Sequence, residues 1–164
     1  MTEAGDSGPR ALDERRRSPF SAFIGTEMEE MRDGYVRLSL VLQPHHTNPN
    51  GVMHGGVVTT MMDSALGAAL GSLRGDDAKR NPHATIEMNA SFLAAARADE
   101  IVVEGRVLRL GKSIAFGEAE ARRRGDGELI AKGRFTFAIR RQEEGRRKKE
   151  AGEGRPSSFL LPPS

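Results

Sequence analysis

The chain has 164 residues, enough for one domain with a single sizeable hydrophobic core. Its mean hydropathy is -0.50 and no apolar run reaches the length of a membrane span, so we expect no contact with a membrane. The pI is near 9.3, but the basic excess lies in residues 140–164 and the rest of the chain has no cationic surplus, which argues against nucleic acid as a partner.

Both ends of the chain are predicted to be flexible tails. Residues 1–18 are charged and lack the apolar stretch of a secretory signal, so we expect a cytoplasmic protein. The absence of cysteine fits a reducing compartment and excludes disulfides, thiolate zinc sites and a cysteine nucleophile. Residues 140–164 are strongly charged, have no apolar periodicity and end in a proline-containing stretch. The folded domain is therefore expected to span residues 19–139.

The predicted domain begins with a short apolar segment, residues 19–24, that Gly25 closes. Two strand-like segments follow at residues 26–31 and 35–42, and the second, "YVRLSLVL", alternates between apolar and polar side chains. The Asp33-Gly34 pair between them is a hairpin signal. We therefore predict two antiparallel neighbouring strands at the start of the domain.

One long helix is predicted over residues 55–73, where Asp63 is the only charged side chain. Most of its residues are apolar, and the remaining positions recur three and four residues apart, so they form a stripe: Gly56, Thr59, Thr60, Asp63, Ser64, Gly67 and Gly71. One interpretation is that this stripe faces water and that Asp63 is an ordinary surface acid. A solvent-facing stripe normally carries lysine, arginine and glutamate, however, so small and hydroxyl side chains favour close packing against a second subunit.

The start of this helix also has two interpretations. Asn50-Gly51 forms a turn and Gly55-Gly56 opens the helix, either as a tight junction or as a site where free backbone N–H groups receive a carbonyl or an anion. Gly55 and Asp63 are eight residues apart, which corresponds to about 12 Å at about 1.5 Å per residue. If both groups act on one substrate, Asp63 must therefore come from a neighbouring subunit.

Four further strands are predicted at residues 83–93, 100–110, 113–124 and 129–139. Glycine-containing turns separate the last three of them, at residues 110–112 and 125–127. The predicted order is two strands, one helix and four strands. This order indicates an α+β fold in which an antiparallel sheet packs on the long helix.

Four stretches together resemble the hotdog-fold thioesterases of the phenylacetate-degradation (PaaI-like) type. They are "NPNGVMHGGVVTTMMDSALGAAL", "HATIEMNASFL", "RVLRLGKSIAFGEAEA" and "GELIAKGRFTFAI", and the likeness extends over about residues 19–139. The resemblance implies a long central helix wrapped by an antiparallel sheet of about six strands. It also implies homodimers with a continuous sheet, often assembled into homotetramers, and an active site shared between subunits.

The resemblance also implies roles for five residues. Asp63 would be the catalytic carboxylate, acting as a general base on water or attacking the thioester itself, and the Gly55 amide would polarise the thioester carbonyl. Asn48 would orient water or the leaving sulfur, and Thr85 would steady the water beside the acid. His54 would support the loop and the carbonyl site rather than act as a base.

The same resemblance makes an acyl-CoA the expected substrate, with hydrolysis to a carboxylic acid and free CoA. Gly56 would border the substrate, and Arg109, Lys112 and Ser113 are candidates for contacts with the CoA phosphates, although ordinary surface charge explains them equally well. Since a thioester carbonyl is already electrophilic, hydrolysis requires an activated water and an oxyanion site, so we expect no metal and no cofactor beyond the CoA of the substrate.

Two other functions stay open at this stage: a non-catalytic acyl-CoA-binding hotdog module, and an acyl-thioester hydratase or dehydratase.

Three other sequence patterns are not interpreted as functional sites. The "GDSG" of residues 5–8 lies in a predicted tail, and the "GKS" of residues 111–113 joins two strands and lacks the earlier glycine of a phosphate-binding loop. The histidines lack metal-ligand spacing and are expected in polar loops: His45, His46, His54 and His83.

Overall fold

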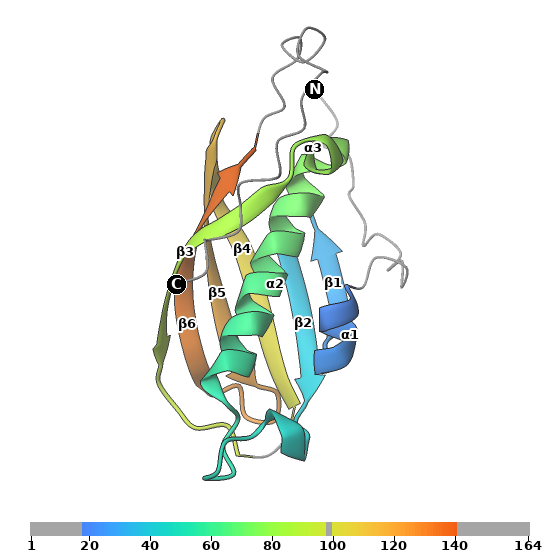
Figure 1. The fold of residues 1–164 in the computed structure, drawn as a ribbon. Helices are drawn as coiled ribbons and strands as arrows, with labels where there is room; N and C mark the ends of the chain where they lie inside the picture. The colour runs from blue at the N-terminus through green and yellow to red at the C-terminus, as the bar shows by residue number, and fades with distance from the viewer. Residues whose placement is uncertain (1–17, 98–99, 141–164) are drawn as a thin grey trace, which may run out of the picture.

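The computed structural model describes residues 18–97 and 100–140, so almost all of the two predicted tails lies outside the described residues, as does the "GDSG" of residues 5–8. The elements in chain order are α1 (Pro19–Ile24), β1 (Glu27–Arg32), β2 (Tyr35–Val41), the 3-10 helix η2 (Pro44–His46), α2 (Gly55–Arg74), α3 (Asp76–Arg80), β3 (His83–Phe92), β4 (Glu100–Leu110), β5 (Ile114–Arg123) and β6 (Leu129–Ile139). The strands form one antiparallel sheet in the order β1-β2-β4-β5-β6-β3, and α2 lies across one face of it (Figure 1). The α+β prediction and the predicted order of strands and long helix are confirmed. None of the helices in the described ranges has both the length and the hydrophobicity to cross a bilayer.

Two short α-helices and the 3-10 helix η2 were not predicted. The α1 helix begins at the N-cap Ser18, whose hydroxyl accepts from the Ser21 amide at 3.0 Å, and it ends at Gly25 with φ 84°. The α3 helix has two acids in its first turn and two basic residues in its last, which suits the helix dipole. Both are shorter than two turns, so apolar periodicity cannot reveal them.

The long helix α2 approaches the centre of the sheet very closely because a row of small residues crosses the sheet there. Gly105, Ala119, Gly133 and Ala90 occupy paired positions on β4, β5, β6 and β3. A Cβ added at Gly105 would lie 2.9 Å from the backbone carbon of Ala65 in α2. Larger side chains in this row would therefore push the helix off the sheet.

The side chains of α2 divide into a buried set and a less buried set, as the stripe predicts. The residues that face the sheet are buried: Val58, Met61, Met62, Ala65, Leu66, Ala69 and Leu70. Every member of the predicted stripe keeps some exposure in the single chain. Leu73 is apolar but 39% exposed, because it lies at the last turn of the helix beyond the sheet-facing residues. The face of α2 that carries Asp63 is thus only partly covered by this chain's own sheet.

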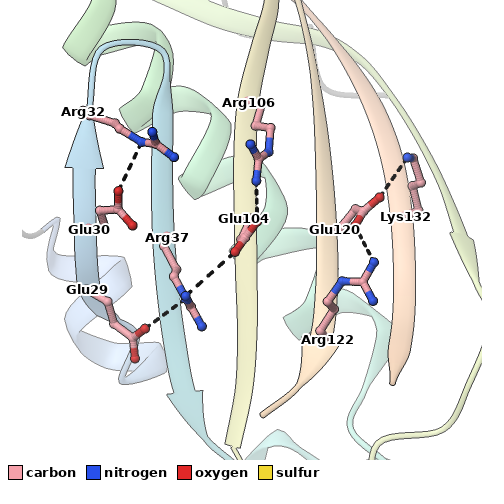
Figure 2. A network of polar contacts seen from close by, with 9 residues as sticks. All are labelled: Glu29, Glu30, Arg32, Arg37, Glu104, Arg106, Glu120, Arg122 and Lys132. Atoms are coloured by element: carbon pink, nitrogen blue, oxygen red, sulfur yellow. Dashed lines mark hydrogen bonds and ion pairs between the residues drawn. The ribbon is translucent and has the colours of Figure 1, made fainter. Parts of the chain in front are cut away.

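The opposite face of the sheet carries interleaved charges of both signs (Figure 2). Arg37, Glu104, Glu120 and Lys132 occupy paired positions on β2, β4, β5 and β6. Lys132 Nζ lies 2.8 Å from Glu120 Oε1, and hydrogen bonds from Lys132 and then Arg122 lower the pKa of Glu120. This outer surface is therefore largely neutralised by its own ion pairs.

The strand β3 is an edge of the sheet. Within the described residues it pairs only with β6, and its pairing is interrupted by a bulge between Thr85 and Glu87. Large apolar side chains on and just after β3 are exposed: Ile86, Met88, Phe92 and Leu93. An exposed apolar edge strand is a template for pairing with another strand.

Candidate active site

The His-Gly-Gly sequence forms the N-terminal cap of α2. Steric fit or hydrogen bonding explains the residue found at each of its three positions. His54 is the N-cap of α2, and its Nδ1 accepts from the Gly56 amide at 2.9 Å. Since Nδ1 accepts this bond, the proton of the neutral ring is on Nε2. A Cβ on Gly56 would lie 2.9 Å from the same Nδ1 atom, so the ring fits only beside a glycine. His54 is therefore occupied as a structural cap.

Replacing His54 by alanine should lower the free energy of unfolding by about 1 kcal/mol, because the first turn of α2 loses its side-chain acceptor. Replacement by aspartate should cost less, since a carboxylate is also a good N-cap acceptor and favours the positive end of the helix dipole. Urea unfolding of both variants measures the difference. Equal destabilisation by alanine and aspartate would contradict the capping role.

Gly55 is the first residue of α2, and its amide donates to no group within the described parts of the chain. The ring of Phe92 packs against its Cα, since a Cβ at this position would lie 3.1 Å from Phe92 Cζ. The two residues also line a mostly apolar pocket of about 390 Å³, with Val52, Met53, Val58, Leu93, Ala94, Ala95, Ala96 and Ile130. A free N–H at a helix N-terminus beside an apolar pocket suits a carbonyl group that carries an apolar substituent.

Asn48 holds the loop that leads into the helix. Its Oδ1 accepts from the backbone amides of Asn50 at 2.9 Å and Val52 at 3.3 Å, and its own amide donates to the Val52 carbonyl at 2.8 Å. Because the side-chain oxygen is used in this way, only the Nδ2 group of Asn48 is available to contact a ligand.

Asp63 and Thr85 are brought together, as the resemblance implies. Thr85 Oγ1 on β3 donates to Asp63 Oδ1 on α2 at 2.6 Å, a short charge-assisted hydrogen bond. The other carboxylate oxygen has no hydrogen-bond partner among the described residues. The carboxylate is thus held by one oxygen, and its second oxygen remains available to a water or a substrate.

The remaining predicted residues do not gather around Gly55 in one chain. Arg109 ends up near the end of β4, and Lys112 and Ser113 form the exposed turn that follows. Lys112 lines a cavity of about 560 Å³ with Arg74 and Asp77, beyond the C-terminal end of α2. Since α2 is 20 residues long, this cavity and the Gly55 amide are about 30 Å apart in the same chain. Within one chain Lys112 and Gly55 therefore lie at opposite ends of α2.

The histidines do not form a metal site. Within residues 18–97 and 100–140, no group of three or more histidine, aspartate or glutamate side chains can hold an ion. His46 is buried and structural, because Nδ1 accepts from the Gln43 amide at 3.0 Å and Nε2 donates to the Ile24 carbonyl at 2.8 Å. Burial and the neighbouring His45 lower its pKa.

Sequence reasoning missed three residues that contact the candidate site or the elements that carry it. Phe92 covers Gly55. Arg74, about three helical turns beyond Asp63, contacts His83 at 3.2 Å. His83 shares a strand face with Thr85 because the two are two residues apart, which was a usable signal. Arg74 is the first charged residue after Asp63, but its contacts depend on the path of α3.

Comparison with known proteins agrees with this geometry. The sequence model of the thioesterase superfamily matches residues 50–130. Human acyl-coenzyme A thioesterase 13 is 32% identical over 105 residues, which cover 63% of this chain and 71% of that protein. The chain spans 57% of a Caenorhabditis elegans relative and 66% of a mouse relative.

Solved structures show the same architecture. A conserved protein of Pseudomonas aeruginosa is 33% identical, with a TM-score of 0.71 over 77% of this chain and 99% of that chain. The PaaI protein from the phenylacetic acid degradation operon of E. coli shares the fold at 16% identity, with a TM-score of 0.68 over 76% of this chain and 86% of that one. The chain therefore belongs to the thioesterase superfamily, and its domain has the hotdog fold.

Proposed function

We propose that this protein is an acyl-CoA thioesterase that hydrolyses the thioester to a carboxylic acid and free CoA. The observation that carries the proposal is the free Gly55 amide and the Thr85-held Asp63 carboxylate on the same helix. The Gly55 amide can donate a hydrogen bond to a thioester carbonyl, and the Asp63 carboxylate can accept a proton from a water. Membership of the thioesterase superfamily and the likeness to human acyl-coenzyme A thioesterase 13 support this chemistry.

The reaction balances without a metal or an added cofactor. In one route the Asp63 carboxylate takes a proton from water while the water oxygen bonds to the carbonyl carbon, and the negative charge on the carbonyl oxygen is stabilised by the Gly55 amide. The C–S bond then breaks, and the CoA thiolate takes up the proton that Asp63 holds. In the other route Asp63 attacks the carbonyl carbon and expels the thiolate, and water then hydrolyses the mixed anhydride. Both routes use the same two groups.

We infer that the site is formed between two copies of the chain. Gly55 and Asp63 are about 12 Å apart along α2, at about 1.5 Å per residue. The two groups of one chain therefore cannot both contact one carbonyl. The exposed edge of β3 adjoins the partly exposed face of α2 that carries Asp63, and these surfaces suit pairing with a second copy. We propose a homodimer, assembled into a tetramer, in the cytoplasm.

The CoA portion of the substrate is expected to contact the turn that carries Lys112. This turn lies at the C-terminal end of α2, so two antiparallel copies of α2 would bring it toward the partner's Gly55 end. A flexible lysine on an exposed turn is a suitable phosphate contact. The apolar pocket beside Gly55 can then receive the acyl group.

Thiol release from a panel of acyl-CoAs with short, long and aromatic acyl groups tests the proposal. We expect release of CoA and the matching acid in equal amounts from at least one class. Binding of acyl-CoA without any thiol release would favour the non-catalytic binding module. Addition of water across an unsaturated acyl chain, with the thioester left intact, would favour the hydratase.

A further inference from the structure

The C-terminal end of α2 contains a buried cation that joins three elements. The side chain of Arg74 is 3% exposed. Its Nη2 donates to Asp77 Oδ2 on α3 at 2.7 Å and to the Asn81 carbonyl at 2.5 Å, and its Nη1 lies 3.2 Å from His83 Nδ1 on β3. A planar guanidinium can make these contacts simultaneously, whereas a lysine cannot.

The contact with Arg74 determines which nitrogen of the neutral His83 ring carries the proton. Because a guanidinium has only donors, His83 Nδ1 must be the acceptor, and the proton of the neutral ring is on Nε2. The Nε2 atom lies 3.8 Å from the position of a Cβ on Gly67, and the Gly67 carbonyl interacts with the ring. Phe137 of β6 packs against the same ring with centroids 5.8 Å apart. The ring is therefore fixed between α2 and β6.

The distance from His83 to Thr85 along β3 matches the distance from Gly67 to Asp63 along α2. Gly67 follows Asp63 by four residues, which is about 6 Å along a helix. His83 precedes Thr85 by two residues, which is about 6.7 Å along a strand and on the same strand face. The His83 contact with α2 therefore places Thr85 opposite Asp63. This matters because β3 is an edge strand whose pairing is disturbed by the bulge directly after Thr85.

We propose that Arg74 and His83 are positioning residues that lock the start of β3 against α2, so that Thr85 holds the Asp63 carboxylate in its working orientation. The inference rests on the proposed role of Asp63. Neither residue needs to touch the substrate, since both act through Thr85.

The Arg74–His83 contact is also sensitive to pH. The groups that face His83 are Arg74 and Asp63 on α2, Asp77 on α3 through its bond to Arg74, and the uncharged Phe137 on β6. Burial and then the Arg74 charge lower the pKa of His83 below 6.5, so the ring is neutral at pH 7. The unfolded chain takes up this proton first, so the stability contributed by the contact is complete above about pH 6.5 and is lost as the pH falls through the folded pKa.

The test compares His83→Leu, which removes the acceptor, with His83→Asn, which keeps an acceptor near the position of Nδ1. We expect His83→Leu to lower kcat by about 10- to 100-fold, since a misplacement of about 1 Å can have this effect, and to change KM little. His83→Asn should recover most of the loss. The wild type should show a protonation step in kcat below pH 6.5 that the leucine variant lacks. Glu87→Gln, on the outer face of the same strand, is the matched control and should leave both constants unchanged.

Crystal structures of the wild type and of His83→Leu provide a second measurement that does not depend on activity. The proposal expects the 2.6 Å contact between Thr85 and Asp63 to lengthen or break in the variant. A retained contact with unchanged kcat and pH profile would overturn it. If the wild type hydrolyses no acyl-CoA, the proposed function fails, and the two structures still decide the positioning role. Should His83→Leu not fold, Arg74→Met is used in the same comparison.

Discussion

Replacing Asp63 by asparagine should lower the rate of thiol release by about 10²- to 10⁴-fold, the contribution typical of a positioned general base, or by more if Asp63 is the nucleophile. Asparagine keeps the size of the side chain and the acceptor for the Thr85 hydroxyl. The fold and the affinity for acyl-CoA should therefore be retained. Steady-state kinetics and calorimetric binding of a non-hydrolysable acyl-CoA analogue measure the two properties separately.

The matched control for this variant is Asp76→Asn, the same chemical change at an exposed acid on α3 that pairs with Lys79. It should have the activity of the wild type. Turnover by Asp63→Asn at the wild-type rate would remove Asp63 from the mechanism. The thioesterase assignment would then need another base.

Mixing two inactive variants should restore activity if the site is shared between subunits. Gly55→Pro removes the N–H that is proposed to bind the carbonyl, at a helix position where proline is otherwise tolerated. In a mixed dimer with Asp63→Asn, one site contains an intact Gly55 and an intact Asp63, and the other site contains both changes. With statistical exchange half of the dimers are mixed, so we expect about a quarter of the wild-type activity.

Differently tagged subunits show whether mixed dimers form. Thiol release in the unfractionated mixture measures the recovery, and the purified mixed dimers should have about half of the wild-type activity. The Gly55→Pro change also meets the Phe92 ring, so its folding is checked by thermal unfolding. Mixed dimers that remain as inactive as their parents would exclude a site shared between Gly55 and Asp63 of different chains.

Much of the fold could be predicted because long elements have strong periodic patterns. The alternation in β2 and the three- and four-residue spacing in α2 located the sheet, the helix and the less buried face of the helix. The eight-residue separation of Gly55 and Asp63 also predicted that one chain would hold the two groups apart. The short helices α1 and α3 could not be found in this way, because their caps and end charges are local signals without periodicity.

The contacts around Asp63 were predictable only in part. Thr85 was expected beside Asp63 from the resemblance, and the two are within 2.6 Å. The Arg74–His83 contact depends on how α3 returns the chain to β3, which no pattern in residues 75–82 specifies. Phe92 was likewise predicted as a strand residue, but its packing on Gly55 depends on the position of β3 beside α2. Sequence patterns specify faces of elements, whereas these contacts depend on the path of the connections between them.

The interleaved charges on the outer face of the sheet have a consequence for folding. Successive strand residues point to opposite faces, so a slip of one residue in any strand would turn its whole set of side chains over. In β4 and β6 such a slip would place Glu104 or Lys132 where Gly105 and Gly133 now meet α2 at close range. A charged side chain there would have neither space nor a partner, and burying an unpaired charge is costly. The surface charges therefore disfavour the misregistered sheets, and they protect the alignment of β3 on which the proposed site depends.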